Sequence, residues 1–412
     1  MCHNGRTGTH RSAMGDSTFL TRVLLENYKS IARCDVSLGP LTFLVGPNGS
    51  GKSNFLDALR FVTESLRTSL DHALRERGGI KEVLPRSLHP THFGLRIDFR
   101  LPTGEQGFYA FRIEVLSEGG YRVQREDCVV SSLAHYSVRY GEVVSTSAHV
   151  APAATGDRLY LVNASGLPEF RRIYEALSRM GFYSLNPDKI RELQLPDTGE
   201  LLLQNGGNLA SVLAQLATYS PGTKKRIDEY LSRVVSGVLG VEARSIGPRE
   251  TLVFRQRIGP SKLAFGLFAS SMSDGTLRAL GVLVALFQSA NGRAGQVPLV
   301  GIEEPEIALH PAAAGVLLDA LREGSERTQV LVTSHSPELL DDSKIPSESI
   351  LAVVAHRGLT QIGPLDEVGA SALRDRLYTP GELLRLNQLT PNPSATGGLA
   401  AEQLDLFGGD AV

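Results

Sequence analysis

The chain has 412 residues, of which 42% are hydrophobic and 21% charged, and its formal net charge is −2. This length allows roughly two or three domains, and the balanced charge excludes the basic excess that marks many nucleic-acid-binding proteins. The cysteines, Cys2, Cys34 and Cys128, lack C-x-x-C spacing, so neither a disulfide framework nor a zinc site is predicted. No apolar run reaches the roughly 20 residues that span a bilayer, so we expect a cytoplasmic protein without a membrane partner.

The first regular elements begin after a polar, unpatterned stretch. Residues 1–17 are predicted to be a disordered leader, unless translation starts at Met14. Beyond it, apolar spacing predicts three strands and then a helix, at 19–26, 35–38, 41–45 and 54–70.

The segment Gly46–Ser53 lies between the third strand and that helix. Its spacing, G-x-x-x-x-G-K-S, is typical of a phosphate-binding loop, whose backbone N–H groups surround the polyphosphate of a nucleotide. Lys52 would contact the β- and γ-phosphates and Ser53 would bind Mg²⁺, at the positive end of the helix. The alternative is a Gly-rich turn that binds nothing. The predicted nucleotide-binding residues are Gly46, Pro47, Asn48, Gly49, Ser50, Gly51, Lys52, Ser53 and Asn54.

The middle of the chain changes its periodicity twice. Alternating runs at 95–101, 111–115 and 121–129 predict an antiparallel sheet. Residues 168–238 have helical spacing, broken by prolines and glycines, and predict a compact helical insertion. Helices and strands then alternate, which predicts a parallel core, at 276–287, 299–302, 311–322 and 330–333. The expected boundaries are lobe I at 18–160, the insertion at 168–238, lobe II at 241–385 and a flexible tail at 386–412.

Two of these buried strands end in polar clusters. Glu303 and Glu304 follow the strand 299–302, where the first would complete the Mg²⁺ shell and the second would orient the attacking water. His335 follows the strand 330–333 and would sense the γ-phosphate. Acidic residues after a strand can also be helix caps, and a histidine there is often structural.

Four further residues have weaker signals. Ser273 and Gly275 open a helix, where a cap and a close backbone approach would suit a phosphate, although Ser-Asp-Gly is also common turn chemistry. Glu306 would favour the N-terminus of the next helix. His310 would serve as a helix cap or as a dimer contact.

Together these segments resemble the ABC-type ATPase heads of the SMC, RecF and OLD proteins, within the AAA-family ATPases. The resembling motifs are Asn27–Ser30, Gly46–Asn54, Ser273–Thr276, Ile302–Pro311 and Thr333–Pro337. The resemblance implies an α/β fold, an ABC/SMC-type ATPase head with a mixed sheet, an antiparallel β subdomain, a parallel core and a compact helical insertion. It implies Mg²⁺-dependent ATP hydrolysis and a head-to-tail homodimer, in which Ser273 and Gly275 contact the γ-phosphate bound to the partner subunit.

The chain departs from that pattern in three ways. Glu303 stands where many ABC heads have aspartate. The glutamine of the family's Q-loop stays unassigned, because Gln106 and Gln124 have no distinguishing context. A long coiled coil is not expected, because the compact insertion at 168–238 stands in its place. A C-terminal Toprim nuclease domain is not expected either, since fewer than about eighty residues follow His335.

The tail ends in a short apolar cluster, Gln403, Leu404, Asp405, Leu406 and Phe407. It resembles the motif with which bacterial polymerases and repair proteins dock on the β sliding clamp, with Gln403 in a polar pocket and the apolar side chains in a hydrophobic one. The alternative is that this segment packs back on its own ATPase domain.

Two functions fit the sequence. The first is a RecF-like ATPase that acts on DNA in replication or repair and docks on the sliding clamp. The alternative is an ATPase sensor in an anti-phage defence system, working with a separate nuclease or other effector. A transporter motor fits least, because the segment between the phosphate loop and Ser273 is too long. Basic clusters at 171–172 and 224–226 would contact DNA or simply be solvated.

Overall fold

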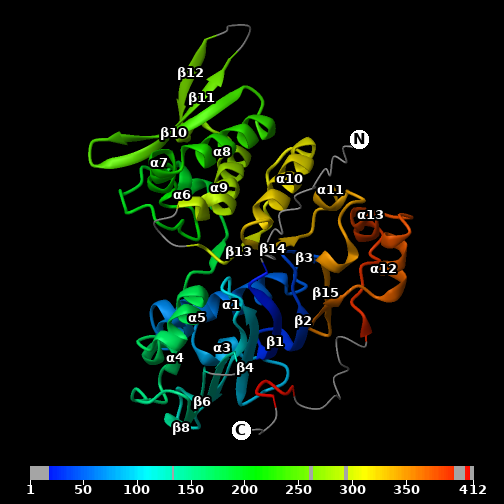
Figure 1. The fold of residues 1–412 in the computed structure, drawn as a ribbon. Helices are drawn as coiled ribbons and strands as arrows, with labels where there is room; N and C mark the ends of the chain where they lie inside the picture. Colours follow the sequence, from blue (N-terminus) through cyan, green and yellow to red (C-terminus); the bar gives the residue numbers. More distant parts are fainter. Residues whose placement is uncertain (1–17, 132–133, 259–262, 292–295, 394–403, 409–412) are drawn as a thin grey trace, which may run out of the picture.

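The computed structural model describes residues 18–131, 134–258, 263–291, 296–393 and 404–408. A seven-stranded and a six-stranded sheet form most of the lower part of the molecule, and a helical body with a small third sheet rises above them (Figure 1). The predicted leader at 1–17 lies outside the described residues.

The seven-stranded sheet is antiparallel, as predicted, with the order β2-β1-β4-β5-β6-β7-β8. Its inner face carries large apolar side chains, such as Tyr109 and Phe111 of β5, that pack against α1 in one core. The alternate residues of β5, Phe108 and Ala110, face the other way and belong to a separate small cluster. The strands are β1 (Leu20–Tyr28), β2 (Ile31–Ser37), β4 (His92–Arg100), β5 (Gln106–Val115), β6 (Tyr121–Val130), β7 (Ala134–Arg139) and β8 (Glu142–Thr146).

The six-stranded sheet is mixed and has the order β16-β15-β3-β14-β13-β9. All its pairs are parallel except β15 with β16. It lies between two cores, because Leu44 of β3 faces the core around α1 whereas Phe43 and Val45 face the core of the helical body. Its strands are β3 (Leu41–Val45), β9 (Gly181–Tyr183), β13 (Leu299–Glu303), β14 (Gln329–Ser334), β15 (Ile350–His356) and β16 (Leu359–Pro364).

The helices divide between the two bodies. Those packed in or beside the lower core are α1 (Lys52–Arg67), α2 (Leu70–Arg75), α3 (Ile80–Val83), α4 (Tyr160–Ala164) and α5 (Pro168–Ser178). Those of the upper body and the C-terminal side are α6 (Pro187–Arg191), α7 (Leu209–Tyr219), α8 (Pro221–Val234), α9 (Asp274–Phe287), α10 (Ala314–Ser325), α11 (Pro337–Leu340), α12 (Glu367–Arg374) and α13 (Pro380–Arg385). No helix among the described residues has the length and apolarity needed to cross a membrane.

The segment 168–238 differs from the expected helical insertion. Its first helix, α5, buries Phe170 and Ile173 in the lower core, and β9 adds a strand to the six-stranded sheet. Only α6, α7 and α8 belong to the helical body. The three residues of β9 are too few to show a strand alternation in the sequence. A small antiparallel sheet follows, made of β10 (Val238–Ile246), β11 (Arg249–Arg257) and β12 (Ala264–Phe268).

Candidate functional site

The predicted nucleotide-binding residues meet at one edge of the six-stranded sheet. Strands β3, β14 and β13 are parallel neighbours, with Val45 opposite Ser334 and Thr333 opposite Glu303. The loops after all three strands therefore leave the sheet on the same side. The phosphate loop, His335 and the glutamate pair come from segments far apart in the sequence, and the topology brings them to this common edge.

The phosphate loop is tight because three of its residues are glycines. Gly49 and Gly51 have φ values of 77° and 101°, which other residues rarely adopt. A Cβ on Gly46 would collide with the carbonyl oxygen of Val353 in β15. These positions bend the backbone over the start of α1, where the first N–H groups of the helix have no partner within it.

The Lys52 side chain is hydrogen-bonded to the backbone of the phosphate loop. Its ammonium donates to the carbonyl oxygens of Gly46 at 2.9 Å and Pro47 at 3.0 Å. Burial lowers the pKa of Lys52, and the nearby Glu304 and Glu306 oppose that effect. The hydroxyl of Ser50 is buried without a hydrogen-bond partner among the described residues. A buried cation and an unpartnered hydroxyl in a glycine-rich cradle fit a polyphosphate.

A chain of hydrogen bonds holds the loop against two distant segments. The Asn54 amide donates to the Ser30 hydroxyl at 2.7 Å, and Ser30 lies 2.6 Å from the Thr360 hydroxyl. The Thr360 hydroxyl also donates to the Ser50 carbonyl at 2.8 Å. Ser30 and Thr360 were not predicted as site residues, because their partners lie far away in the sequence. Asn54, predicted to bind nucleotide, has its side-chain amide on Ser30.

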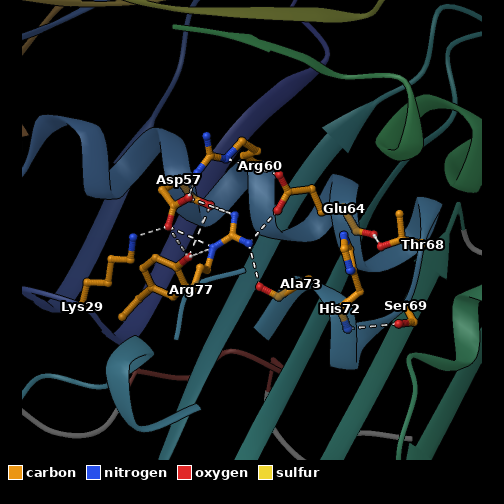
Figure 2. Close-up of polar contacts among 10 residues, drawn as sticks. Lys29, Asp57, Arg60, Glu64, Thr68, Ser69, His72, Ala73 and Arg77 are labelled. Atoms are coloured by element: carbon orange, nitrogen blue, oxygen red, sulfur yellow. Dashed lines mark hydrogen bonds and ion pairs between the residues drawn. The ribbon is translucent and has the colours of Figure 1, made fainter. Parts of the chain in front are cut away.

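A buried ion network fixes the far side of α1 (Figure 2). Asp57 accepts from the Tyr28 hydroxyl at 2.8 Å, the Lys29 ammonium at 2.6 Å, and the guanidinium groups of Arg60 and Arg77 at 2.5 and 2.9 Å. Although burial opposes it, these cations and hydrogen bonds hold the pKa of Asp57 well below its usual range. The network joins the turn after β1 to α1, one turn beyond Ser53.

Glu303 and Ser53, the residues predicted to bind Mg²⁺, are hydrogen-bonded to each other. Burial raises the pKa of the Glu303 carboxyl, while a hydrogen bond from Ser53 and the charge of Arg60 act in the other direction. The contact places a hydroxyl and a carboxylate side by side at the mouth of the phosphate loop. Two hard oxygen donors in this position fit Mg²⁺, which favours such ligands together with phosphate oxygens.

Glu304 and His335 also lie together. The Nδ1 of His335 is 3.0 Å from a carboxylate oxygen of Glu304, and a carboxylate at this distance accepts the Nδ1–H. The backbone N–H of Glu304 donates to the Thr333 carbonyl at 3.0 Å, and Glu304 has a φ of 44°. An ordinary residue held in the left-handed region is a strained position, and such positions cluster at functional sites.

Glu306 and His310 both make contacts within the chain, and the dimer contact of His310 stays a prediction. Glu306 accepts from the Ser334 hydroxyl at 2.6 Å, and burial raises the pKa of its carboxyl. It therefore ties the loop after β13 to the end of β14 and does not cap the helix after Pro311. His310 does cap that helix, because its Nδ1 accepts from the backbone of Ala312 at 3.2 Å.

Ser273 and Gly275 differ in their exposure. Ser273 is the exposed N-cap of α9, and its hydroxyl accepts from the Thr276 backbone at 3.3 Å. Gly275 is buried, and a Cβ there would collide with the carbonyl oxygen of Ala308. Gly275 thus allows α9 to approach the loop after Glu304 within the same chain. Contact with a phosphate in trans stays a prediction for both residues.

The two glutamines considered for the unassigned Q-loop position both lie on the seven-stranded sheet. Gln124 donates to Glu114 and Tyr140 on the seven-stranded sheet, and Gln106 begins β5 of the same sheet. The carboxyl end of β9 lies beside that of β13 and is followed by the exposed residues Ser184 and Asn186. These are the polar side chains that the sequence analysis missed at this edge, because β9 was not predicted.

The end of the tail packs on the protein itself. Leu404, Leu406 and Phe407 are buried in a small cluster with Leu24 and Ala110 of the seven-stranded sheet. Gln403 lies outside the described residues. The contact corresponds to the alternative considered for this segment, and clamp docking stays a prediction.

Two family models match parts of the chain. Residues 19–103 match a model described as an AAA ATPase domain. Residues 237–341 match one described as "AAA domain, putative AbiEii toxin, Type IV TA system". The first match contains the phosphate loop. The second contains Ser273, Glu303, Glu304 and His335.

A solved SMC head bound to the C-terminal winged-helix domain of ScpA superposes with a TM-score of 0.56, at 14% identity over 85% of this chain and 99% of that one. The chain has the fold of an ABC/SMC-like ATPase head. An SMC head from Pyrococcus furiosus gives a TM-score of 0.53 at 12% identity, over 87% and 99% of the two chains. The predicted fold class is confirmed.

Curated relatives match different shares of the chain. The OLD nuclease of Thermus scotoductus is 26% identical over 78% of the chain and 60% of its own length. Structural maintenance of chromosomes protein 1 of Schizosaccharomyces pombe is 28% identical over 42% of the chain. RecF of Vibrio vulnificus is 44% identical over 41 residues. The chain spans 15% of the length of the SMC relative and 60% of that of the OLD relative.

Proposed function

We propose that this head hydrolyses ATP with Mg²⁺, dimerises head-to-tail on ATP, and acts on DNA in replication or repair. The observation that supports it most is the meeting of the phosphate loop, Glu303, Glu304 and His335 at the carboxyl ends of three adjacent parallel strands. Lys52 and the loop backbone would hold the polyphosphate. Ser53 and Glu303 would hold Mg²⁺, which neutralises phosphate charge when bound.

Glu304 is the proposed residue that orients the attacking water. His335, hydrogen-bonded to it, holds the carboxylate in place and would detect the γ-phosphate. Ser273 is exposed at the start of α9, so a second copy of the head can reach it. In the proposed dimer, Ser273 of one subunit closes the site of the other.

The DNA-linked role is supported by relatives. RecF is described as a DNA replication and repair protein, and the matched SMC protein maintains chromosome structure, as its name states. The tail segment 403–407 would bring the head to the β sliding clamp. Because its apolar residues are packed on the sheet, clamp docking requires their release.

A second candidate is an ATPase sensor for anti-phage defence with a separate effector. It is supported by the match of residues 237–341 to a domain whose description names a type IV TA system. Stimulation of ATP hydrolysis by gapped or primed DNA, and ATP-dependent dimerisation, favour the repair role. A rate that DNA leaves unchanged, together with no clamp binding, refutes it.

The Glu304→Gln variant tests the chemistry directly. We expect ATP to bind with unchanged affinity, hydrolysis to fall about 100-fold or more, and a dimer to accumulate in light scattering with ATP. Glu118→Gln, in the exposed turn between β5 and β6, is the matched control and should hydrolyse ATP normally. Unchanged hydrolysis in Glu304→Gln would remove that residue from its proposed role.

A further inference from the structure

The last described residues of the tail cover part of the outer face of the seven-stranded sheet. Leu404, Leu406 and Phe407 are 6%, 0% and 9% exposed. They pack on Leu24 of β1 and on Ala110 of β5, with Phe108 beside them. The red segment at the bottom of Figure 1 lies against this sheet. Without the tail, an apolar strip would face solvent on a side of the sheet where no helix of the described residues joins the cluster.

A glycine on the sheet makes room for the side chain of Leu406. Gly94 lies in the middle of β4, and a Cβ there would overlap the Cδ1 of Leu406. Glycine is unfavourable inside a strand, and it is often found where another group packs closely against the strand backbone. Since Leu406 is fully buried over this glycine, the sheet has a slot that admits one branched aliphatic side chain.

Three arginines of the sheet contact the tail segment. Arg96 donates to the carbonyl oxygen of Leu406 at 3.3 Å. The guanidinium groups of Arg112 and Arg125 lie over the Phe407 ring, 5.5 and 4.3 Å from its centroid. Cations over an aromatic face attract it beyond the apolar contact.

Residues 404–408 of the tail form a local turn. The carboxylate of Asp405 accepts from the backbone N–H groups of Phe407 at 3.1 Å and Gly408 at 2.7 Å. This local turn leaves Asp405 exposed while the flanking apolar residues are buried. The sheet face and the tail therefore match in shape, in apolar surface and in aromatic–cation pairing.

We propose that the outer face of β1, β4, β5 and β6 is a docking site for a Leu-x-Leu-Phe peptide, and that the chain's own residues 404–407 occupy it. The segment cannot present Leu404, Leu406 and Phe407 to another protein while they are buried here. Docking on the sheet and binding to a partner through the same side chains exclude each other. The identity of the partner as the sliding clamp rests on the proposed function, whereas the docking site does not.

A labelled synthetic peptide of residues 402–409 tests the site on the full-length protein. In the variant with Leu404, Leu406 and Phe407 all changed to alanine, the resident tail no longer competes, so the peptide should bind at least ten times more tightly than to the wild type. Adding Gly94→Ala should abolish this binding. Gly222→Ala, which adds a Cβ into open space at α8, is the matched control and should leave it unchanged.

Thermal unfolding of each variant checks that Gly94→Ala keeps the fold. Equal peptide affinity for the wild type and the triple variant, no binding to either, or binding that survives Gly94→Ala would each overturn the proposal. A photo-crosslinking aromatic residue in place of Phe108, which packs beside the docked tail, should join the sheet to the tail within one chain. Crosslinks between two chains would instead show that a second copy supplies the tail.

Purified β sliding clamp provides a separate outcome. If the clamp is the partner, Gly94→Ala in the otherwise wild-type chain should bind it more tightly, because the tail is free and intact. If no variant binds the clamp, that partner is refuted while the peptide result still decides the docking site.

Discussion

Arg77 gives the sharpest stability prediction, because it is a buried cation with a buried partner. Its side chain is 3% exposed, and that of Asp57 is 6% exposed. It donates to Asp57 at 2.9 Å and to Glu64 at 2.6 Å (Figure 2). Its guanidinium also lies 5.2 Å from the centre of the Phe61 ring. Arg77→Met keeps much of the side-chain volume and removes the charge.

Removing one partner of a buried ion pair typically costs about 3–5 kcal/mol, since the other charge stays buried. Here we expect the lower end of that range, because Lys29 and Arg60 still contact Asp57. The stability supplied by the lowered pKa of Asp57 is present above about pH 4 and is lost as the pH falls below it.

Urea denaturation at neutral pH, followed by circular dichroism, measures this loss. Arg75→Met is the matched control two residues away, where an ion pair to Asp71 has exposed fractions of 77% and 49%. Such surface pairs contribute about 0–1 kcal/mol. A loss in Arg77→Met no greater than that in Arg75→Met would refute the reasoning.

Two further predictions concern the phosphate loop and a buried carboxyl. Gly46→Ala should abolish ATP binding measured by calorimetry, since its Cβ collides with Val353, and unchanged affinity would contradict this. Burial raises the pKa of Glu126 from 4.5 to about 7, although Tyr136 and the backbone of Tyr160 donate to it. The folded state then holds a proton that the unfolded chain has lost, so stability should fall by about 3 kcal/mol as the pH rises through that interval. Glu126→Gln should remove this slope from the denaturation midpoints, and a slope that persists would assign it to other groups.

The parts of the site that the sequence predicted are those in which an apolar strand runs directly into a polar cluster. Gly46–Ser53, Glu303–Glu304 and His335 all have this form, and parallel pairing at neighbouring positions brings them together. The antiparallel sheet was predictable because its strands alternate over many residues.

Several parts that the sequence missed depend on distant partners or on a very short strand. Thr360 supports Ser50 from 310 positions away, and Arg96 contacts Leu406 across the same separation. Local periodicity carries no information about such pairs. The strand β9 has three residues, and the polar side chains after it were missed with it. The strands β15 and β16 were not predicted either, although they have seven and six residues.

The close approach of Gly275 to Ala308 links the two faces of each subunit. In the proposed dimer, Ser273 touches nucleotide held by the partner, while the same turn of α9 bears on the loop that carries its own Glu304. Filling one site would thus shift the glutamate of the other. Hydrolysis at the two sites would then be coupled, and a bulkier residue at Gly275 would change that coupling.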